Sequence, residues 1–449
     1  MIGASLSRWT MSYFAAALVA LVAAEIMMVA GYGFPAASIG APETLILVHV
    51  VAIGWLSLLM CGALLQFLPV LVAKPLYSDA LALPALVALV AGLAALILGF
   101  LQLGGRIAPG VPFLAIAAIL LIAGFALIVW NLARTMAAAK TIPLPARFVL
   151  VGLAGLALTA ALGATFALTL GGTVTSGPLL TLTVAGLPIH VVAGLGGWLN
   201  ITAVGVSYRL LAMFMLAPEL ERRTTSGALY LGAAALGVAV AGGILMVLLE
   251  AGPSLALLAG LALGLVALAL YGFDAGHLYR ARKRPKIELN SRMAAFALAS
   301  LAASVALVVI LLALGRLGDQ TGAVVYLVAF GWLSGLGLAQ LYKIVAFMTW
   351  LECYGPVLGK APTPRVQDLV TETRAEKWFW LYFVAVWAGA AALLAGFPLA
   401  FRFAAALSLA ATIGILAQLV RTRRLADVKA AIRLPRGAQP PRLLMTHQP

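Results

Sequence analysis

The tripeptide Gly-Trp-Leu occurs three times in this chain, beginning at Gly54, Gly197 and Gly331, and each copy lies inside a long apolar segment. The copies follow one another at intervals of roughly 140 residues, which is typical of one structural unit used three times. The flanking residues agree, because His49-Val-Val-Ala precedes the first copy and His190-Val-Val-Ala precedes the second. We therefore predict three repeats, covering approximately residues 1–140, 141–286 and 287–424.

The composition requires a membrane environment. Hydrophobic residues make up 64% of the 449 residues and charged residues only 10%, too few polar side chains to cover a water-soluble domain. A membrane-spanning helix needs about 20 apolar residues. No cleavable signal peptide is expected, because the first apolar stretch is full length. We predict a single all-α, polytopic membrane domain in contact with the lipid bilayer, with twelve spans at approximately residues 9–33, 44–73, 79–104, 110–134, 147–171, 186–216, 227–250, 254–279, 293–316, 321–352, 377–397 and 399–421.

Positive charges are distributed unevenly among the predicted loops. The net charge of +15 comes mainly from the loops after the fourth, sixth, eighth and tenth spans, whereas the opposite loops carry little beyond Arg106, Arg316 and Arg402. Lys and Arg favour cytoplasmic loops, so both termini are predicted to be cytoplasmic and residues 425–449 to form a basic cytoplasmic tail. The positive charge thus reflects membrane topology, and no nucleic-acid partner is expected.

The three tripeptides fall on the second, sixth and tenth spans, which run in the same direction in this topology. Twelve spans then divide into three pseudo-symmetric groups of four, unlike the two groups of six of many secondary transporters. We expect Trp55, Trp198 and Trp332 to occupy equivalent positions around an approximate three-fold axis. Two roles stay open for the glycines: close approach of neighbouring helices, or space for a flat ligand between them.

Three ionisable residues lie within apolar spans toward the same predicted side of the membrane. His49 and His190 lie near the starts of spans two and six, and Glu25 lies on span one. An ionisable group in the hydrocarbon is costly and is a functional candidate by default. Imidazole is a common ligand of haem iron and copper, and a carboxylate can orient it through its second nitrogen. We therefore assign His49 and His190 as candidate haem or metal ligands, with Glu25 as a cofactor-supporting residue.

The alternative for the same residues is hydrogen bonding within the bundle. A histidine near a helix end can bond a backbone carbonyl, and a protonated Glu25 can bond a neighbouring side chain. Asp274 and His277, one helical turn apart at the end of span eight, are expected to form a solvated pair at the membrane interface. Cys61 and Cys353 are expected to be small apolar fillers.

The arrangement of spans and histidines resembles subunit I of the haem-copper oxidase superfamily. The segment from Trp198 to Phe214 is similar to non-catalytic relatives of that subunit, including NnrS-type membrane proteins. There a His-x-His element precedes Gly-Trp or Gly-Phe by seven and five residues; His190 matches the first of these histidines and His49 the second. The resemblance implies a bacterial inner-membrane protein that binds haem or copper.

The sequence departs from the oxidase pattern at two spans. Span seven, where the superfamily has a His-His pair that binds copper, contains no histidine, and in span ten Tyr326 stands where a haem-binding histidine would match His49. We therefore expect no binuclear oxygen-reducing centre, no bis-histidine haem between spans two and ten, and no terminal oxidase activity. Any other enzymatic activity is left open.

The leading hypothesis is a haem- or copper-binding membrane protein of the oxidase subunit I fold. The resemblance implies a role in metal or haem handling, or in a nitric-oxide or redox stress response. Two alternatives remain open. One is a cofactor-free transporter or channel in which Glu25, His49 and His190 line a polar pathway; the other is a scaffold for partner subunits that the sequence does not identify.

Overall fold

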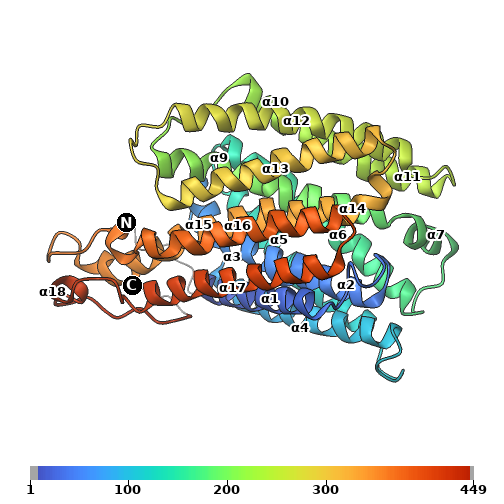
Figure 1. The fold of residues 1–449 in the computed structure, drawn as a ribbon, viewed down its shortest axis with the longest axis horizontal. Coiled ribbons are helices and arrows are strands. Elements are labelled where there is room, and N and C mark those ends of the chain that lie inside the picture. Colours follow the sequence, from blue (N-terminus) through green and yellow to red (C-terminus); the bar gives the residue numbers. More distant parts are fainter. Residues whose placement is uncertain (1–8, 445–449) are drawn as a thin grey trace. The chain divides into compact units, whose positions relative to one another are not determined.

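The computed structural model describes residues 9–444, and every regular element in that range is a helix (Figure 1). Helices suit a membrane because each backbone N–H and C=O is bonded within its own segment. Within the described residues, twelve helical stretches are long and apolar enough to cross a membrane, which confirms the predicted all-α polytopic fold: Thr10–Ala30, Pro42–Leu71, Asp79–Leu103, Phe113–Ala137, Leu144–Leu170, Leu187–Met215, Arg223–Leu248, Ser254–Arg280, Leu289–Ala313, Leu317–Val357, Glu372–Leu394 and Pro398–Arg423.

The helices form two compact units. The first unit contains the residues up to Gln66 together with those from Ile287 onward. In it α1 packs on η1 and α17, α13 packs on η5 and α15, and α16 lies beside α17 (Figure 1). Its elements are α1 (Thr10–Ala30), α2 (Pro42–His49), η1 (Val50–Ser57), the first part of α3 (Leu58–Leu71), α13 (Leu289–Ala313), α14 (Leu317–Tyr326), η5 (Leu327–Ser334), α15 (Gly335–Tyr354), η6 (Gly355–Val357), η7 (Val366–Leu369), α16 (Glu372–Leu394), α17 (Pro398–Arg423) and α18 (Ala430–Arg433).

The second unit covers residues from Phe67 to Lys286. In it α5 packs on α4 and α6, α6 also packs on η3 and α9, and α10 packs on α12. After the end of α3, its elements are η2 (Asp79–Leu81), α4 (Ala82–Leu103), α5 (Phe113–Ala137), α6 (Leu144–Leu170), α7 (Gly177–Ala185), α8 (Leu187–Val191), η3 (Val192–Ile201), α9 (Thr202–Met215), α10 (Arg223–Leu236), η4 (Gly237–Gly242), α11 (Gly243–Leu248) and α12 (Ser254–Arg280). The boundary between Lys286 and Ile287 coincides with the predicted start of the third repeat, whereas the boundary after Gln66 matches no predicted repeat limit. The division into three groups of four therefore stays a prediction.

All three Gly-Trp-Leu tripeptides lie in π-helical segments. These segments are η1, η3 and η5, each continuous with α-helix on both sides. Each packs on the span that precedes it in the chain, namely α1, α6 and α13. π-Helical turns are rare in proteins overall, but those that occur are often found at functional sites. The sequence repeat is therefore accompanied by a repeated local conformation.

Glycines permit close helix packing at the second and third tripeptides, through Gly155 opposite Gly197 and through Gly331 itself. A Cβ atom added to Gly155 of α6 would lie 2.8 Å from the backbone of Gly197, and one added to Gly331 would lie 2.8 Å from the Cβ of Ser300 on α13. At these two positions, glycine lets the neighbouring helix approach. The tripeptide tryptophans are all buried, and the indole Nε1 of Trp55 donates to Ser334 Oγ at 2.7 Å, joining η1 to η5 within the first unit.

Large apolar side chains are exposed along the spans. Val19 is 70% exposed, Ile119 68% and Leu255 68%. In water such surfaces would promote aggregation, whereas in a bilayer they face lipid. The apolar exterior supports lipid contact along the helices.

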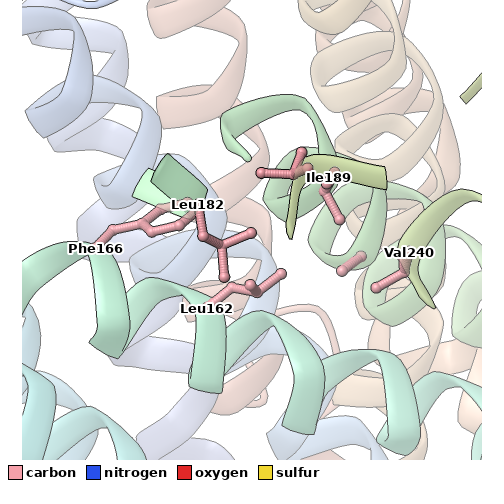
Figure 2. Packing of buried hydrophobic residues seen from close by; sticks show 7 residues of the cluster. Leu162, Phe166, Leu182, Ile189 and Val240 are labelled. Atoms are coloured by element: carbon pink, nitrogen blue, oxygen red, sulfur yellow. The ribbon is translucent and has the colours of Figure 1, made fainter. Parts of the chain in front are cut away.

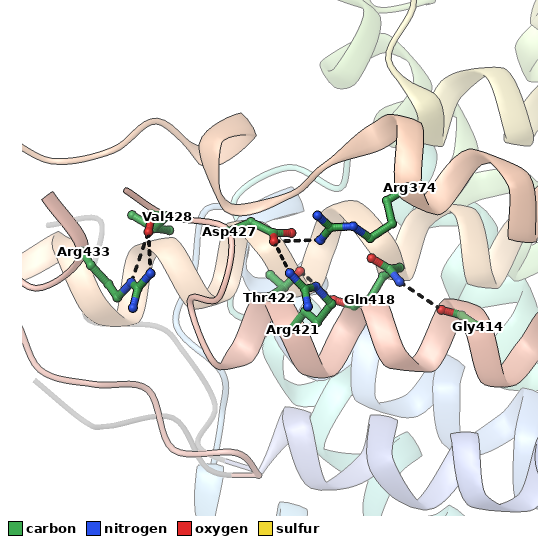
Figure 3. Close-up of polar contacts among 8 residues, drawn as sticks. All are labelled: Arg374, Gly414, Gln418, Arg421, Thr422, Asp427, Val428 and Arg433. Carbon is green, nitrogen blue, oxygen red and sulfur yellow. Dashed lines mark hydrogen bonds and ion pairs between the residues drawn. The ribbon is translucent and has the colours of Figure 1, made fainter. Parts of the chain in front are cut away.

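The basic segment that follows α17 packs against the first unit. Tyr354 Oη donates to the carbonyl of Arg433 at 2.7 Å, and Leu425 and Val428 are buried with Cys353 and Leu369. Arg374 and Arg421 both bond Asp427 Oδ1, at 2.8 and 2.5 Å, and the guanidinium of Arg433 bonds the carbonyl of Val428 (Figure 3). Up to residue 444, the predicted tail is thus an integral part of the first unit; residues 445–449, with His447, lie outside the described range.

Candidate functional site

His49 ends α2, directly before the π-helical segment η1. Its Nδ1 lies 2.7 Å from the carbonyl oxygen of Leu45, one helical turn earlier. Because a carbonyl can only accept a hydrogen bond, Nδ1 carries a proton, and a neutral imidazole in this tautomer has its lone pair on Nε2. A backbone carbonyl bonded to one ring nitrogen is the usual way in which proteins orient a histidine that binds a metal through the other nitrogen.

His190 lies in the short helix α8, four residues after Gly186, whose carbonyl accepts the backbone N–H of His190 at 3.0 Å. Its ring packs on α6, with its centroid 5.5 Å from that of Phe166. A Cβ atom on Gly163 would lie 3.1 Å from the imidazole Cε1, so a glycine makes room for the ring. The preceding Ile189 belongs to an apolar cluster with Leu162, Phe166 and Val240 (Figure 2). Close packing therefore fixes the position of His190.

Glu25 is a fully buried residue of α1. Its Oε1 accepts hydrogen bonds from Ser408 Oγ at 2.6 Å and from Thr412 Oγ1 at 3.0 Å, both on α17. Its Oε2 is buried without a hydrogen-bond partner. The hydrogen bonds of Glu25 thus join α1 to α17 instead of orienting an imidazole, and its role beside His49 stays a prediction.

The three predicted site residues are divided between the two units. His49 and Glu25 belong to the first unit and His190 to the second. In residues 9–444, no group of three or more His, Cys, Asp and Glu side chains is placed to hold a metal ion. A cofactor shared by His49 and His190 therefore remains a hypothesis.

Three residues around Glu25 were not predicted as parts of a site. Ser408 and Thr412 bond it directly, and its charge interacts with the buried hydroxyl of Tyr326. Ser408 and Thr412 could have been recognised in the sequence as two hydroxyl residues one helical turn apart in an apolar span. Nothing in the sequence shows that this face of α17 packs on the face of α1 that carries Glu25.

A second buried carboxylate lies in the second unit. Asp274 of α12 accepts three hydrogen bonds, shared between its two oxygens: from Thr224 Oγ1 at 2.6 Å, Thr225 Oγ1 at 2.9 Å and Tyr208 Oη at 3.0 Å. The prediction of a solvated Asp274–His277 pair is wrong, because Asp274 is 0% exposed. His277 instead lies at the surface, where its Nε2 is 2.8 Å from Arg222 Nη2. The Asp274 cluster joins α9, α10 and α12.

Other buried polar and sulfur-containing side chains have ordinary structural roles. Cys61 and Cys353 are buried free thiols, as expected for apolar fillers. Lys343 Nζ forms a 2.7 Å ion pair with Glu288 Oε2 that is largely buried. Arg423 and Glu352 form a buried ion pair of 2.7 Å where α17 meets α15.

Comparison with known proteins identifies no protein-family model and no curated protein that matches this sequence. The resemblance to non-catalytic relatives of oxidase subunit I therefore rests on the residues and span pattern alone.

Proposed function

We propose that this chain is an integral membrane protein that binds haem or copper, with His49 and His190 as the ligands. The observation that carries the proposal is the hydrogen bond from His49 Nδ1 to the Leu45 carbonyl, which selects the tautomer whose Nε2 would coordinate the metal. The position of His49 at the junction with a π-helical segment adds support, because such segments are frequent at functional sites. When bound, haem or copper would supply one-electron redox chemistry or a site for a small gas molecule.

The chain's own residues would hold the group and control its surroundings. The Leu45 carbonyl fixes the ring of His49, and Phe166 and Gly163 fix the ring of His190. In keeping with the resemblance to NnrS-type proteins, the proposed physiological role is metal or haem handling or a nitric-oxide or redox stress response. Terminal oxidase activity is not part of the proposal.

The test compares histidine variants of the purified full chain. We expect His49→Ala and His190→Ala, together, to remove bound haem or copper, measured by absorption spectroscopy and elemental analysis. His277→Ala is the matched control, because His277 bonds Arg222 at the surface and should leave the cofactor content unchanged. Circular dichroism and gel filtration establish that each variant is folded. Full retention of haem and copper by the double variant would refute the assignment.

A second candidate function is cofactor-free transport along a polar pathway that includes Glu25. The observation that favours it is the buried carboxylate oxygen of Glu25 without a hydrogen-bond partner, because unpaired ionisable groups inside a membrane mark routes for ions or protons. Wild-type protein that carries neither haem nor copper, yet moves an ion across vesicles, would select this function over the first.

The proposed location is the bacterial inner membrane with both termini in the cytoplasm. It is supported by the concentration of Lys and Arg in alternate loops. The test fuses, after residue 424, a reporter enzyme that is active only outside the cytoplasm. We expect this fusion to be inactive; an active fusion would show that the predicted orientation is wrong.

A further inference from the structure

The surroundings of Glu25 have an unequal distribution of hydrogen-bond donors. Ser408 and Thr412 both donate to Oε1, whereas Oε2 accepts no hydrogen bond. Glu25, Ser408 and Thr412 are each at most 1% exposed, and no basic side chain among residues 9–444 forms an ion pair with Glu25. One of the two carboxylate oxygens therefore accepts no hydrogen bond from the protein, in a buried part of the first unit.

Tyr326 supplies a second unused polar atom in the same region. Its hydroxyl is buried without a hydrogen-bond partner and interacts electrostatically with Glu25. The ring is fixed by stacking on Phe330, at 5.0 Å between centroids, and by an edge contact with Phe401 at 5.2 Å. A Cβ atom on Gly389 of α16 would lie 2.7 Å from this hydroxyl, so the hydroxyl fills the space that glycine leaves. Packing thus holds Tyr326 in place although its hydroxyl lacks a partner.

An ionised Glu25 would need a compensating positive charge. An ionised carboxylate inside a membrane protein is very unfavourable unless a positive charge accompanies it. Arg402, on α17, donates to the carbonyl of Val29 near the end of α1, and Tyr326 and Tyr382 are titratable side chains that interact electrostatically with Glu25. Tyr382 donates to the carbonyl of Phe330 at 2.9 Å. Within the described range, no side-chain cation forms an ion pair with Glu25.

We propose that Glu25, Ser408, Thr412 and Tyr326 form a binding site for a monovalent metal cation of the sodium type. One carboxylate balances one positive charge, and carboxylate and hydroxyl oxygens are the hard ligands that such ions prefer. The Oε2 atom of Glu25 and the hydroxyl of Tyr326 are the two groups that would gain a partner when the ion binds. The site is independent of the proposed haem or copper ligands.

The test measures whether sodium stabilises the purified full chain. A ligand that binds only the folded state raises the unfolding temperature in step with the logarithm of its concentration above Kd. We expect sodium chloride to raise the unfolding temperature of the wild-type protein relative to N-methyl-D-glucamine chloride at equal ionic strength and pH. Glu25→Gln should abolish the shift, because glutamine keeps an oxygen acceptor for Ser408 and Thr412 but carries no charge.

Matched variants separate this site from general effects of salt. Asp274→Asn removes the charge of the other buried carboxylate and should retain the sodium shift, whereas Tyr326→Phe should reduce it. His49→Ala with His190→Ala should also retain it, so failure of the haem or copper proposal and failure of this one are distinguishable. A wild-type protein with equal stability in both salts would overturn the proposal, as would a sodium shift that survives Glu25→Gln. Stability that depends on Glu25 and pH but not on sodium would identify a proton site instead, which also overturns it.

Discussion

Asp274 in the second unit and Glu25 in the first are both buried carboxylates that link transmembrane helices through hydroxyl groups. Asp274 receives three hydroxyl donors, distributed over both oxygens. Glu25 receives two donors on one oxygen and none on the other. In the first arrangement, hydroxyl groups of the protein donate to both carboxylate oxygens. In the second, one carboxylate oxygen has no donor and is available to a bound ligand.

The contrast extends to other side chains of the first unit. The side-chain amides of Asn290 and Gln340 are buried without hydrogen-bond partners. Buried polar groups are nearly always bonded, so unpartnered ones in a native protein point to bound water, ions or other ligands. A buried ionisable residue is therefore informative about function only when its hydrogen bonds have been counted.

The largest expected effect concerns removal of the two carboxylates. Asp274→Ala leaves three hydroxyls without their acceptor and should destabilise the protein by about 3 kcal/mol or more, since each buried group left unsatisfied costs roughly 1–3 kcal/mol. Glu25→Ala removes two hydrogen bonds but also an uncompensated charge, and should cost less than about 2 kcal/mol in sodium-free buffer. Unfolding titrations in detergent micelles measure both. Equal losses of unfolding free energy in the two variants would contradict the proposed difference between the two sites.

A matched pair of tyrosines sharpens the comparison. Tyr208 donates to Asp274 at 3.0 Å, so Tyr208→Phe should cost about 2 kcal/mol, the range for a hydrogen bond to a charged group. Tyr326 has no hydrogen-bond partner, so in the absence of sodium Tyr326→Phe should change the free energy of unfolding by less than about 1 kcal/mol. A larger loss for Tyr326→Phe than for Tyr208→Phe would reverse the assignment of the satisfied and unsatisfied sites.

Two threonines allow a smaller test of the same idea. Thr225→Val and Thr412→Val each remove one hydrogen bond to a buried carboxylate, and each should cost about 1 kcal/mol without sodium. Addition of sodium should widen the gap between wild type and Thr412→Val, while the cost of Thr225→Val stays constant. A sodium-dependent cost at Thr225 would contradict the separation of the sites.

The smallest effect is expected at Asp427, in the segment after α17, where two arginines pair with the carboxylate. Burial raises the pKa of Asp427, but hydrogen bonds from Arg421 and Arg374 outweigh burial and lower it overall (Figure 3). Because the pKa is lowered in the folded state, ionised Asp427 contributes its full stabilisation at pH values above its unfolded-state pKa of about 4. That stabilisation is lost as the pH falls below this value. Because both arginines are partly exposed, Asp427→Asn should cost no more than about 1 kcal/mol at neutral pH. The cost should vanish in acid; an undiminished cost there would show that the pairing is unimportant.

The spans and their approximate limits were predictable from sequence because twenty-residue apolar segments have few alternatives in a membrane. The Gly-Trp-Leu repeat also identified positions that share a local conformation, although the π-helical geometry itself has no sequence rule. The partners of Glu25 were not predictable, since Ser408 lies 383 residues away and only the packing of α1 on α17 brings the two together. Asp274 was misjudged for a related reason: its position near a span end suggested solvent, but α9 and α10 cover it.

The central contrast is tested most directly by counting bound sodium. Equilibrium dialysis with radioactive sodium should find about one ion per wild-type chain, the same number in Asp274→Asn, and none in Glu25→Gln. If wild type and Glu25→Gln bind the same amount of sodium, the unpaired oxygen of Glu25 is not a ligand site and the contrast between the two carboxylates has no functional meaning.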